Sequence, residues 1–377
     1  MRAILFALVV FISVAPATSP RTLDVTDFGA TCDGATDDTA ALQAALTAAN
    51  VAPYRQVTLP PASCRFTQPL TIGNIAGRYS SVSITGHSEY ASELVYDGPA
   101  GSVALAIRHM AAFQWASFRV RRSGPQAGTT GILIDGATGG GTGSQNTLIS
   151  FDHLQVIGFG TGMQVGGTVD ASEVSCRVCT FEANDVGWTD LGQNTLNLWF
   201  EALNLTNNRV GVQLGTSTTW GSGVHVIGGA SHGNSQADFY VRSGFDSFSI
   251  RNFRAEIAAG SWFLATENQQ GSNAPTVTLE DSTILGTAGK PVMQMVAGRI
   301  GGTHIVGQVQ LLINATTITM QDNRLDAGLS ADWPFVQTPF GLHAHLVLSN
   351  NIRNSGGVFP EHHGTYYWGV YTPDLPQ

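Results

Sequence analysis

The sequence is poor in charged residues and has almost no lysine. Asp, Glu, Lys and Arg make up 12% of the 377 residues, and Lys290 is the one lysine. The formal net charge of −9 argues against nucleic acid or an anionic membrane surface as a partner, because both carry negative charge themselves. The same charge disfavours a strongly anionic polysaccharide, unless an arginine cluster or a cation intervenes.

Long apolar runs are also absent, with one exception at the N-terminus. Arg2 precedes an apolar run over residues 3–14, and small residues follow at 15–17. This order is typical of a secretory signal peptide, here predicted over residues 1–17. The run is short for a membrane-spanning helix, so an uncleaved anchor is the lesser alternative. We therefore expect a secreted or periplasmic protein without membrane contact after cleavage.

Glycine is plentiful, and short β-rich runs recur along the chain. The 44 glycines suit strands joined by tight turns and argue against a helical bundle. From about residue 80, runs such as SVSITG, GILIDG and APTVTLEDSTILG start roughly every 20 to 26 residues, which is typical of a solenoid or a propeller. A propeller blade needs about 40 residues and four strands, so the shorter period favours the coils of a β-helix.

Residues 25–46 predict a short strand, a glycine-rich turn and then a helix. Gly29 and Gly34 give the turn its backbone freedom. Asp37 or Asp38 can accept hydrogen bonds from the first free N–H groups of the helix. An apolar stripe with helical spacing follows, formed by Ala41, Leu42, Ala45, Leu46 and Ala49. Such a helix must pack against other apolar surface.

The same segment contains the motifs DFGA, DG and TDDTAALQAAL in this order. It resembles the N-terminal entry of the pectate-lyase-like superfamily, in the rhamnogalacturonase and epimerase-like group, and the resemblance extends through Phe66. The resemblance implies an all-β chain folded as a single-stranded right-handed parallel β-helix, with an N-terminal capping helix. We expect the cap and first coil over residues 18–75, the β-helix over 76–334, and a C-terminal coil and cap over 335–377.

The resemblance also implies a polysaccharide as substrate, but it supplies no catalytic residue. The polygalacturonase-type pattern is absent: the one Asp-Asp pair is Asp37-Asp38 in the cap, and no Arg-x-Lys motif exists. The Arg-based site and acidic calcium cluster of pectate lyases are not recognisable, and the Asp-Pro-His-Asp signature of alginate epimerases is missing. No metal and no other cofactor is predicted.

The four cysteines fall into two pairs. Cys32 and Cys64 both lie in the predicted cap, and export permits a disulfide between them. Cys176 and Cys179 form a C-x-x-C motif, but two further zinc ligands at suitable spacing and a thioredoxin-like context are both missing. For this second pair we expect small buried apolar residues in a strand.

Aligning the coils by their turns places side chains in columns. Asn184, Asn208 and Asn234 fall in one column, where stacked amides can hydrogen-bond to one another and to the turn backbone. A second predicted column contains Gly187, Gly211 and Ala237. We expect both columns to be structural.

Acidic residues of the middle coils are the candidates for catalysis. Neighbouring coils lie about 4.8 Å apart, so one or two coil steps can provide the roughly 5 Å of a retaining carboxylate pair or the roughly 6.5–9.5 Å of an inverting pair. Glu182 and His232 align in one column, and Glu256 falls beside it one coil later. These three residues could form an acid/base cluster.

Two further acidic residues are candidates, although their columns favour ion pairs. Asp185 aligns with Arg209, and Glu201 aligns with Arg177. Each pair can join neighbouring coils electrostatically, and for both acids we favour that structural role over catalysis. An alignment error of one or two residues would change these columns.

Tryptophan in the middle coils could bind sugar, because sugar rings present apolar faces that stack on aromatic planes. Trp220 lies in a Gly/Ser/Thr-rich loop and is the best candidate for exposure. The other tryptophans of this region are expected to pack in the core, namely Trp188, Trp199 and Trp262.

The sequence therefore predicts an exported carbohydrate-active enzyme that cleaves a polysaccharide in a groove along the β-helix, with a glycoside hydrolase using paired carboxylates favoured. The first alternative is a lyase on a uronate-containing glycan, for which His232, Arg254 or Tyr240 could supply the base or bind the uronate. Non-catalytic glycan binding by a surface or spike-like protein is the second alternative, and a structural surface role is the third. We expect a monomer or a homotrimer.

Overall fold

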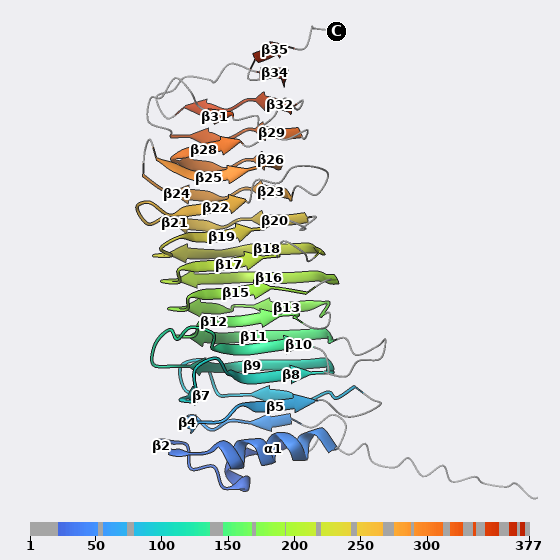
Figure 1. Cartoon of the computed structure of the whole chain (residues 1–377), viewed down its shortest axis with the longest axis vertical. Helices are drawn as coiled ribbons and strands as arrows, with labels where there is room; N and C mark the ends of the chain where they lie inside the picture. Colours follow the sequence, from blue (N-terminus) through green and yellow to red (C-terminus); the bar gives the residue numbers. More distant parts are fainter. Residues whose placement is uncertain are drawn as a thin grey trace, which may run out of the picture.

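Each coil of the chain adds strands to two long parallel sheets (Figure 1). The computed structural model describes residues 22–51, 56–73, 79–135, 146–167, 171–192, 194–215, 220–242, 247–266, 275–287, 290–311, 317–326, 335–336, 344–353, 362–367 and 370–373. The predicted all-β, right-handed parallel β-helix is confirmed. The signal peptide predicted over residues 1–17 lies outside the described residues.

The smaller sheet has 11 strands, and each pairs with the equivalent strand of the next coil. They are β5 (Leu70–Gly73), β8 (Val103–Arg108), β10 (Thr130–Asp135), β12 (Thr161–Val165), β15 (Val186–Asp190), β17 (Val210–Leu214), β19 (Ala237–Val241), β22 (Trp262–Thr266), β25 (Pro291–Met295), β28 (Gln308–Leu311) and β31 (Phe335–Val336).

The larger sheet has 24 strands arranged in two rows, which a bend in each coil separates. The first row contains β1 (Thr22–Asp24), β3 (Gln56–Thr58), β6 (Ser83–Thr85), β13 (Val174–Arg177), β20 (Ser247–Arg251), β23 (Thr276–Glu280), β26 (Ala297–Gly301), β29 (Thr317–Gln321) and β32 (Ala344–Ser349). The second row contains β2 (Asp33–Asp37), β4 (Ser63–Phe66), β7 (Glu93–Tyr96), β14 (Thr180–Glu182), β21 (Arg254–Glu256), β24 (Thr283–Leu285), β27 (His304–Val306), β30 (Arg324–Leu325) and β33 (Ile352–Arg353).

Four long strands run through the bend and belong to both rows: β9 (Ala111–Arg121), β11 (Thr147–Ile157), β16 (Asn194–Thr206) and β18 (Trp220–His232). The parallel order ends at β34 (His362–Tyr367), which pairs antiparallel with β32 and with β35 (Val370–Pro373). No helix in the described part of the chain combines the length and apolarity that a membrane crossing requires.

The bend between the rows keeps one backbone conformation from coil to coil. His153, Val178 and Ala202 occupy it in successive coils with φ of 49°, 53° and 53°. This left-handed region is uncommon for residues other than glycine. The bend interrupts the strict alternation of inward and outward side chains. Residues three positions apart across it, such as Phe200 and Leu203, therefore both point inward and are buried. Positive φ recurs there at Ser117, Gly228, Asn252, Asp281, Gly302, Asp322 and Asn350.

The bend also decides the state of the second cysteine pair. Cys176 and Cys179 are buried, as expected, but they lie on either side of the bend and are bonded to each other, which the sequence interpretation did not predict. In an uninterrupted strand, residues three positions apart point to opposite faces. The left-handed residue between them brings both sulfur atoms to the interior, where they can bond.

The predicted asparagine column is confirmed. Asn184 Nδ2 donates to Asn208 Oδ1 at 3.1 Å, and Asn208 Nδ2 donates to Asn234 Oδ1 at 3.1 Å. All three side chains are buried, so this ladder pairs polar groups that would otherwise be desolvated without partners.

The predicted glycine column is wrong at its last member. Gly187 and Gly211 are neighbours, but Val210 pairs with Ala237, which places Gly211 beside Asp238. The turn of this coil is one residue longer than that of the coil before, and the extra residue shifts the alignment. Asp238 therefore takes an inward position that glycine occupies in the two preceding coils.

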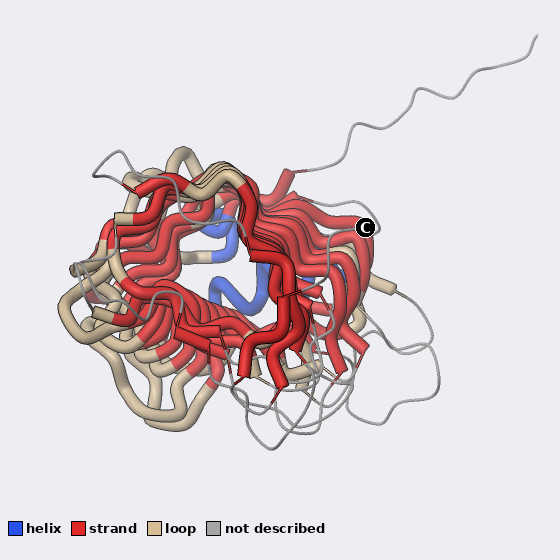
Figure 2. The backbone as a smooth tube through the Cα atoms, turned by 90° about the horizontal axis from the view of Figure 1, so that it is seen from above, coloured by secondary structure: helices blue, strands red, loops and turns tan. Residues whose placement is uncertain are grey.

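Helix α1 (Thr39–Val51) lies across the N-terminal end of the β-helix and covers its interior (Figures 1 and 2). Its predicted apolar stripe is buried at Leu42, Ala45, Leu46 and Ala49. The strand predicted from residue 25 is instead a short 3₁₀ helix, η1 (Val25–Phe28). Asp24 causes this difference, because its carboxylate accepts a hydrogen bond from the Thr26 N–H.

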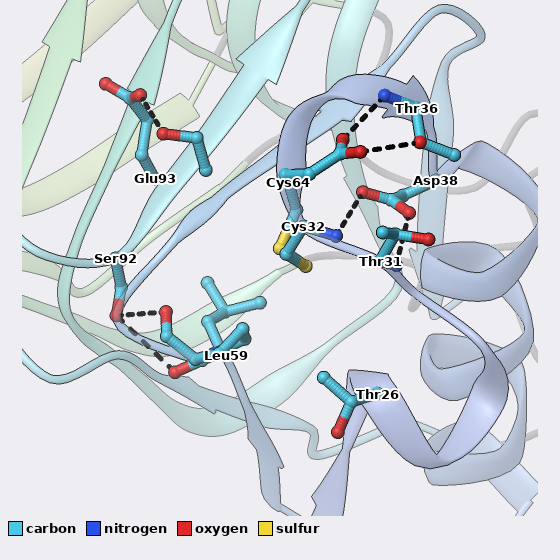
Figure 3. Close-up of a disulfide and its surroundings, with 12 residues drawn as sticks. Thr26, Thr31, Cys32, Thr36, Asp38, Leu59, Cys64, Ser92 and Glu93 are labelled. Carbon is cyan, nitrogen blue, oxygen red and sulfur yellow. Dashed lines mark hydrogen bonds between the residues drawn. A yellow bond between two sulfur atoms is a disulfide. The ribbon is translucent and has the colours of Figure 1, made fainter.

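The predicted disulfide between Cys32 and Cys64 is confirmed and fixes the cap to β4 (Figure 3). Asp38 lies beside it, and its carboxylate accepts from the backbone N–H of Thr31 at 2.7 Å and of Cys32 at 3.0 Å. Of the two candidate capping residues, Asp37 is the one whose side chain accepts from a helix N–H, that of Thr39 at 3.1 Å. The two adjacent aspartates therefore have different structural tasks.

Glu93 is a buried carboxylate that connects β4, β7 and β9. Ser63 Oγ donates to it at 2.6 Å, Arg121 Nε donates at 2.7 Å, and Arg119 Nε lies 2.6 Å away. Burial alone would raise the pKa of Glu93, but the hydrogen bonds from Arg121 and Ser63 and the two arginine charges lower it to about 2. Because this pKa lies below the ordinary 4.5, the stabilisation is present above pH 4.5 and is lost as the pH falls toward 2.

We expect Glu93→Gln to lower the free energy of unfolding at neutral pH by about 3 kcal/mol, because it leaves two half-buried arginines without their carboxylate. It should also weaken the loss of stability in acid. Urea unfolding over the acid range measures both effects. Asp97→Asn, which removes an exposed ion pair with Arg65 of 2.8 Å, is the control and should cost less than about 1 kcal/mol. Equal losses in the two variants would contradict this role.

Candidate functional site

The outer face of the first row gathers aromatic, carboxylate and guanidinium groups in the middle coils. Side chains alternate along a strand, so the residues between the inward columns point outward. Two outward columns run side by side over β11, β13, β16, β18 and β20. Together they are called the Trp199 face, with Ser150, Ser175, Trp199, His225 and Ser249 in one column and Asp152, Arg177, Glu201, Ile227 and Arg251 in the other.

Trp199 and His225 form a stacked pair at the centre of this face. Their ring centroids are 4.2 Å apart and their planes differ by 26°. Trp199 is 42% exposed, so the expectation that it packs in the core is wrong. Ser249 Oγ lies 2.7 Å from His225 Nδ1 and orients the imidazole. Burial and the charge of Arg251 lower the pKa of His225.

The sequence does contain a signal for the exposure of Trp199. In the observed register it lies between Ser175 and His225, and both neighbours are polar. Two polar neighbours in adjacent coils indicate that this position of the first row points outward.

A rim of left-handed residues borders the aromatic pair. Leu148, Glu173 and Asn197 occupy one position in successive coils, with φ of 54°, 55° and 57°. Together with Val174, Ser175 and Trp199 they line an open depression of about 330 Å³. Leu148 is 57% exposed, so the rim offers apolar surface next to a carboxylate.

An arginine lies between two carboxylates in the second column. Arg177 Nη2 donates to Asp152 Oδ2 at 2.5 Å, and His153 Nδ1 lies 2.8 Å from Asp152 Oδ1. The predicted register of Arg177 beside Glu201 is confirmed. The predicted ion pair between them is wrong, because Arg177 binds the carboxylate of the preceding coil instead. Among the described residues Glu201 has no ion-pair partner, and its side chain is exposed.

The two carboxylates of this column have a spacing that suits catalysis. Asp152 and Glu201 are two coil steps apart, which puts their Cα atoms about 10 Å from each other. Two side chains at this Cα spacing that lean toward each other can bring their carboxyl groups to the roughly 6.5–9.5 Å of an inverting glycosidase.

The predicted column of Glu182, His232 and Glu256 is present, but it brings together only two of its members. His232 Nδ1 lies 3.3 Å from Glu256 Oε2, and Arg254 Nη2 lies 3.1 Å from Glu256 Oε1. The hydrogen bond and charge of Arg254 lower the pKa of Glu256. Glu182 is three coil steps from Glu256, or about 14 Å along the axis, which exceeds the spacing of a hydrolytic pair.

The remaining predicted residues lie apart from both clusters. Asp185 forms the predicted ion pair with Arg209, through contacts of 2.6 and 3.0 Å. Tyr240 points outward from the smaller sheet, where the Arg242 guanidinium lies 5.7 Å from its ring centroid. The side chain of Trp220 lies outside the described residues. Trp188, by contrast, is buried as predicted.

One grouping of metal-ligating side chains occurs in the described part of the chain. It contains Cys32, Asp38 and Cys64. Both sulfur atoms belong to the disulfide, and the carboxylate accepts two backbone hydrogen bonds. These atoms are therefore engaged in the structure of the cap.

The N-terminal part of the chain matches a known family. Residues 22–104 match the family described as "Rhamnogalacturonase A/epimerase, pectate lyase-like". This part of the chain is therefore similar to that family, and the chain as a whole shares its parallel β-helix fold with the solved structures below. The matched range includes α1 and the Cys32–Cys64 disulfide and ends before the Trp199 face. No curated protein matches the sequence.

Three solved structures share the fold of this chain over most of its length. The Agl-KA catalytic domain has a TM-score of 0.68 and 14% identity, over 90% of this chain and 66% of its own. The mannuronan C-5 epimerase AlgE4 A-module of Azotobacter vinelandii has a TM-score of 0.60 and 17% identity, and the match covers 88% of this chain and 95% of that module. The catalytic unit of the GH87 α-1,3-glucanase from Streptomyces thermodiastaticus has a TM-score of 0.56 and 15% identity, and the match covers 89% of this chain and 69% of that unit. At these identities the fold is what is shared.

Proposed function

We propose that this chain is an exported glycoside hydrolase that binds a neutral polysaccharide along the Trp199 face and cleaves it with Asp152 and Glu201. One observation carries the proposal: an exposed indole, stacked on an imidazole, lies beside two carboxylates two coil steps apart. The names of two structural neighbours, an α-1,3-glucanase and a mannuronan C-5 epimerase, both specify glycan polymers and support a glycan as ligand.

The aromatic pair gives the sugar a platform. An indole offers a large, rigid apolar plane at little cost in conformational entropy. Exposed Leu148 and Ile227 flank this platform and extend the apolar surface along the β-helix axis. A glycan chain lying parallel to the axis would therefore contact successive coils.

The charges of the face favour a neutral substrate. Arg177 binds Asp152, and Arg251 Nη2 lies 2.7 Å from Glu280 Oε2. Arg299 lies near the same Glu280 carboxylate, at 3.9 Å. The arginines of the face are thus already paired with carboxylates. A uronate chain would have to displace these partners, whereas a neutral chain would not.

The proposed roles follow from the surroundings of each carboxylate. Glu201 is exposed next to Trp199 and Ile227 and acts as the general acid that protonates the leaving glycosidic oxygen. Asp152, held by Arg177 and His153, acts as the general base that activates water from the other side of the bond. The two disulfides fit an oxidising compartment, which supports export.

An assay over neutral and uronate-containing polysaccharides tests the proposal. Release of reducing ends from a neutral polymer, without the ultraviolet absorbance of unsaturated uronates, is the expected result. Absorbance from a uronate polymer would overturn the hydrolase in favour of a lyase. Binding of a polymer without either product would overturn it in favour of a glycan-binding protein.

Trp199→Ala should weaken binding of the polysaccharide about tenfold, which corresponds to about 1.4 kcal/mol, because the platform loses its main apolar plane. Isothermal titration calorimetry with an oligosaccharide of the cleaved polymer measures this. Tyr90→Ala is the matched control, since Tyr90 is 71% exposed in a turn before β7, away from the face. Equal affinities of the two variants would contradict the placement of the glycan.

A further inference from the structure

We propose that the Cys176–Cys179 disulfide is a positioning element of the active site, which holds Arg177 against the Asp152 carboxylate. This inference rests on the proposed function, because it concerns the same pair of carboxylates. The disulfide does not contact the substrate, since both sulfur-bearing side chains are buried in the interior of the β-helix. It acts through the backbone of the two residues that it encloses.

The disulfide closes a four-residue segment around the bend. Cys176 is the last inward-pointing residue of β13, and Arg177 points outward. Val178 has the left-handed conformation, and Cys179 points inward again. The backbone of Arg177 is therefore fixed from both sides by a covalent link. Its guanidinium is the group that reaches Asp152 at 2.5 Å.

Other coils show that the bend itself does not need a disulfide. The coil before it places Phe151 and Leu154 on the two sides of the bend, and the coil after it places Phe200 and Leu203 there. Their bend residues have φ of 49° and 53°, close to the 53° of Val178. Ordinary apolar packing is thus sufficient for this geometry. The disulfide in this coil is therefore not needed to form the bend, and we assign its effect to the backbone of Arg177.

The coil with the disulfide is the one that separates the two carboxylates. Arg177 lies between Asp152 and Glu201 in the column, one coil step from each. A guanidinium that moved by about 1 Å would alter the position of the base, and such misplacement can cost a large factor in rate. Restricting the backbone of Arg177 keeps the base in its reactive position.

The test compares four proteins: the wild type, the double cysteine variant, Arg177→Ala, and Arg177→Ala combined with the double substitution. Cys176→Val/Cys179→Ala removes the bond while nearly keeping the buried apolar volume. We expect its kcat to fall about five- to tenfold with KM unchanged, because ground-state binding of the glycan does not involve Arg177. Thermal stability should change only modestly, since the closed loop is short. In an Arg177→Ala background the same double substitution should have no further effect on kcat.

Removal of the other disulfide, by Cys32→Ala/Cys64→Ala, is the matched control. It should lower stability and leave kcat unchanged below the unfolding temperature. A wild-type kcat in Cys176→Val/Cys179→Ala, or an additive loss in the Arg177→Ala background, would overturn the positioning role while leaving the proposed hydrolase intact.

Crystal structures of the wild type and of Cys176→Val/Cys179→Ala give a readout that does not depend on turnover. Displacement of the Arg177 guanidinium from Asp152 in the variant supports the inference. Retention of the 2.5 Å contact overturns it. If the wild type releases no reducing ends from any polymer, the proposed function fails, and this structural comparison still decides whether the disulfide positions Arg177.

Discussion

The Glu201→Gln variant is expected to bind the polysaccharide with nearly wild-type affinity but to release reducing ends at least about a hundred times more slowly. The amide keeps the size of the side chain and cannot donate a proton to the leaving oxygen. Glu201 lies two residues from Trp199 on β16, on the same outer face, so the lost proton donor is next to the proposed sugar platform. Initial rates under saturating substrate, with calorimetric affinities, separate the two effects.

Glu182→Gln and Glu256→Gln are the controls for this experiment. Glu182 and Glu256 are the last residues of the second-row strands β14 and β21. Glu256 already forms ion pairs with Arg254 and His232. Each control should keep wild-type turnover. Loss of activity in Glu256→Gln together with full activity in Glu201→Gln would move the chemistry to the second row and refute the assignment.

The second large effect concerns a buried acid inside the β-helix. Asp238 is 2% exposed and accepts hydrogen bonds from Ser231 Oγ at 2.5 Å and from Asn234 Nδ2 at 2.6 Å. Ser231 takes the column position that Leu205 has one coil earlier, and the smaller side chain makes room for the carboxyl group. Burial raises the pKa of Asp238 to about 7, against the lowering by the two hydrogen bonds.

This raised pKa gives stability a definite dependence on pH. The folded value of about 7 lies above the ordinary 3.8, so the folded state binds more protons than the unfolded state between these pH values. The free energy of unfolding therefore falls as the pH rises through this window and is level above it. A difference of about three pH units corresponds to at most about 4 kcal/mol. The sign is opposite to that of Glu93, whose contribution is lost in acid.

Asp238→Asn should be more stable than the wild type at about pH 8 by up to a few kcal/mol, and should lack the fall in stability that the wild type shows as the pH rises toward about 7. The amide can keep both contacts, since its oxygen accepts from Asn234 and its nitrogen donates to Ser231. Urea unfolding at a series of pH values measures the slope. Asp185→Asn, at the surface ion pair with Arg209, should keep the wild-type slope. An unchanged slope in Asp238→Asn would show that another group titrates.

Local signals in the sequence were sufficient for the fold and for much of the register. The motifs of residues 25–46 and the repeated β-rich runs identify the capped β-helix. The column of Asn184, Asn208 and Asn234 could be aligned because amides mark one turn in three coils. The alignment failed at Ala237, because one additional residue in that turn has no compositional signature.

The candidate site depended on information that the sequence does not contain directly. Arg177 could pair with a carboxylate on either neighbouring coil, and the register alone does not choose between Asp152 and Glu201. The Cys176–Cys179 bond requires a left-handed residue between the cysteines, and valine, a β-branched residue, gives no hint of that conformation. Both choices are made by packing across coils.

The constant rise of the coils makes distance along a column change only in whole steps. Two Cα atoms in one column can be about 4.8 Å apart, or twice that, and not in between. Loss of one coil between Asp152 and Glu201 would therefore bring their carboxyl groups to the roughly 5 Å of a retaining pair, with the same neighbours above and below. For the proposed hydrolase, the addition or deletion of one repeat would therefore change the stereochemical outcome in a single step, without substitution of either acid.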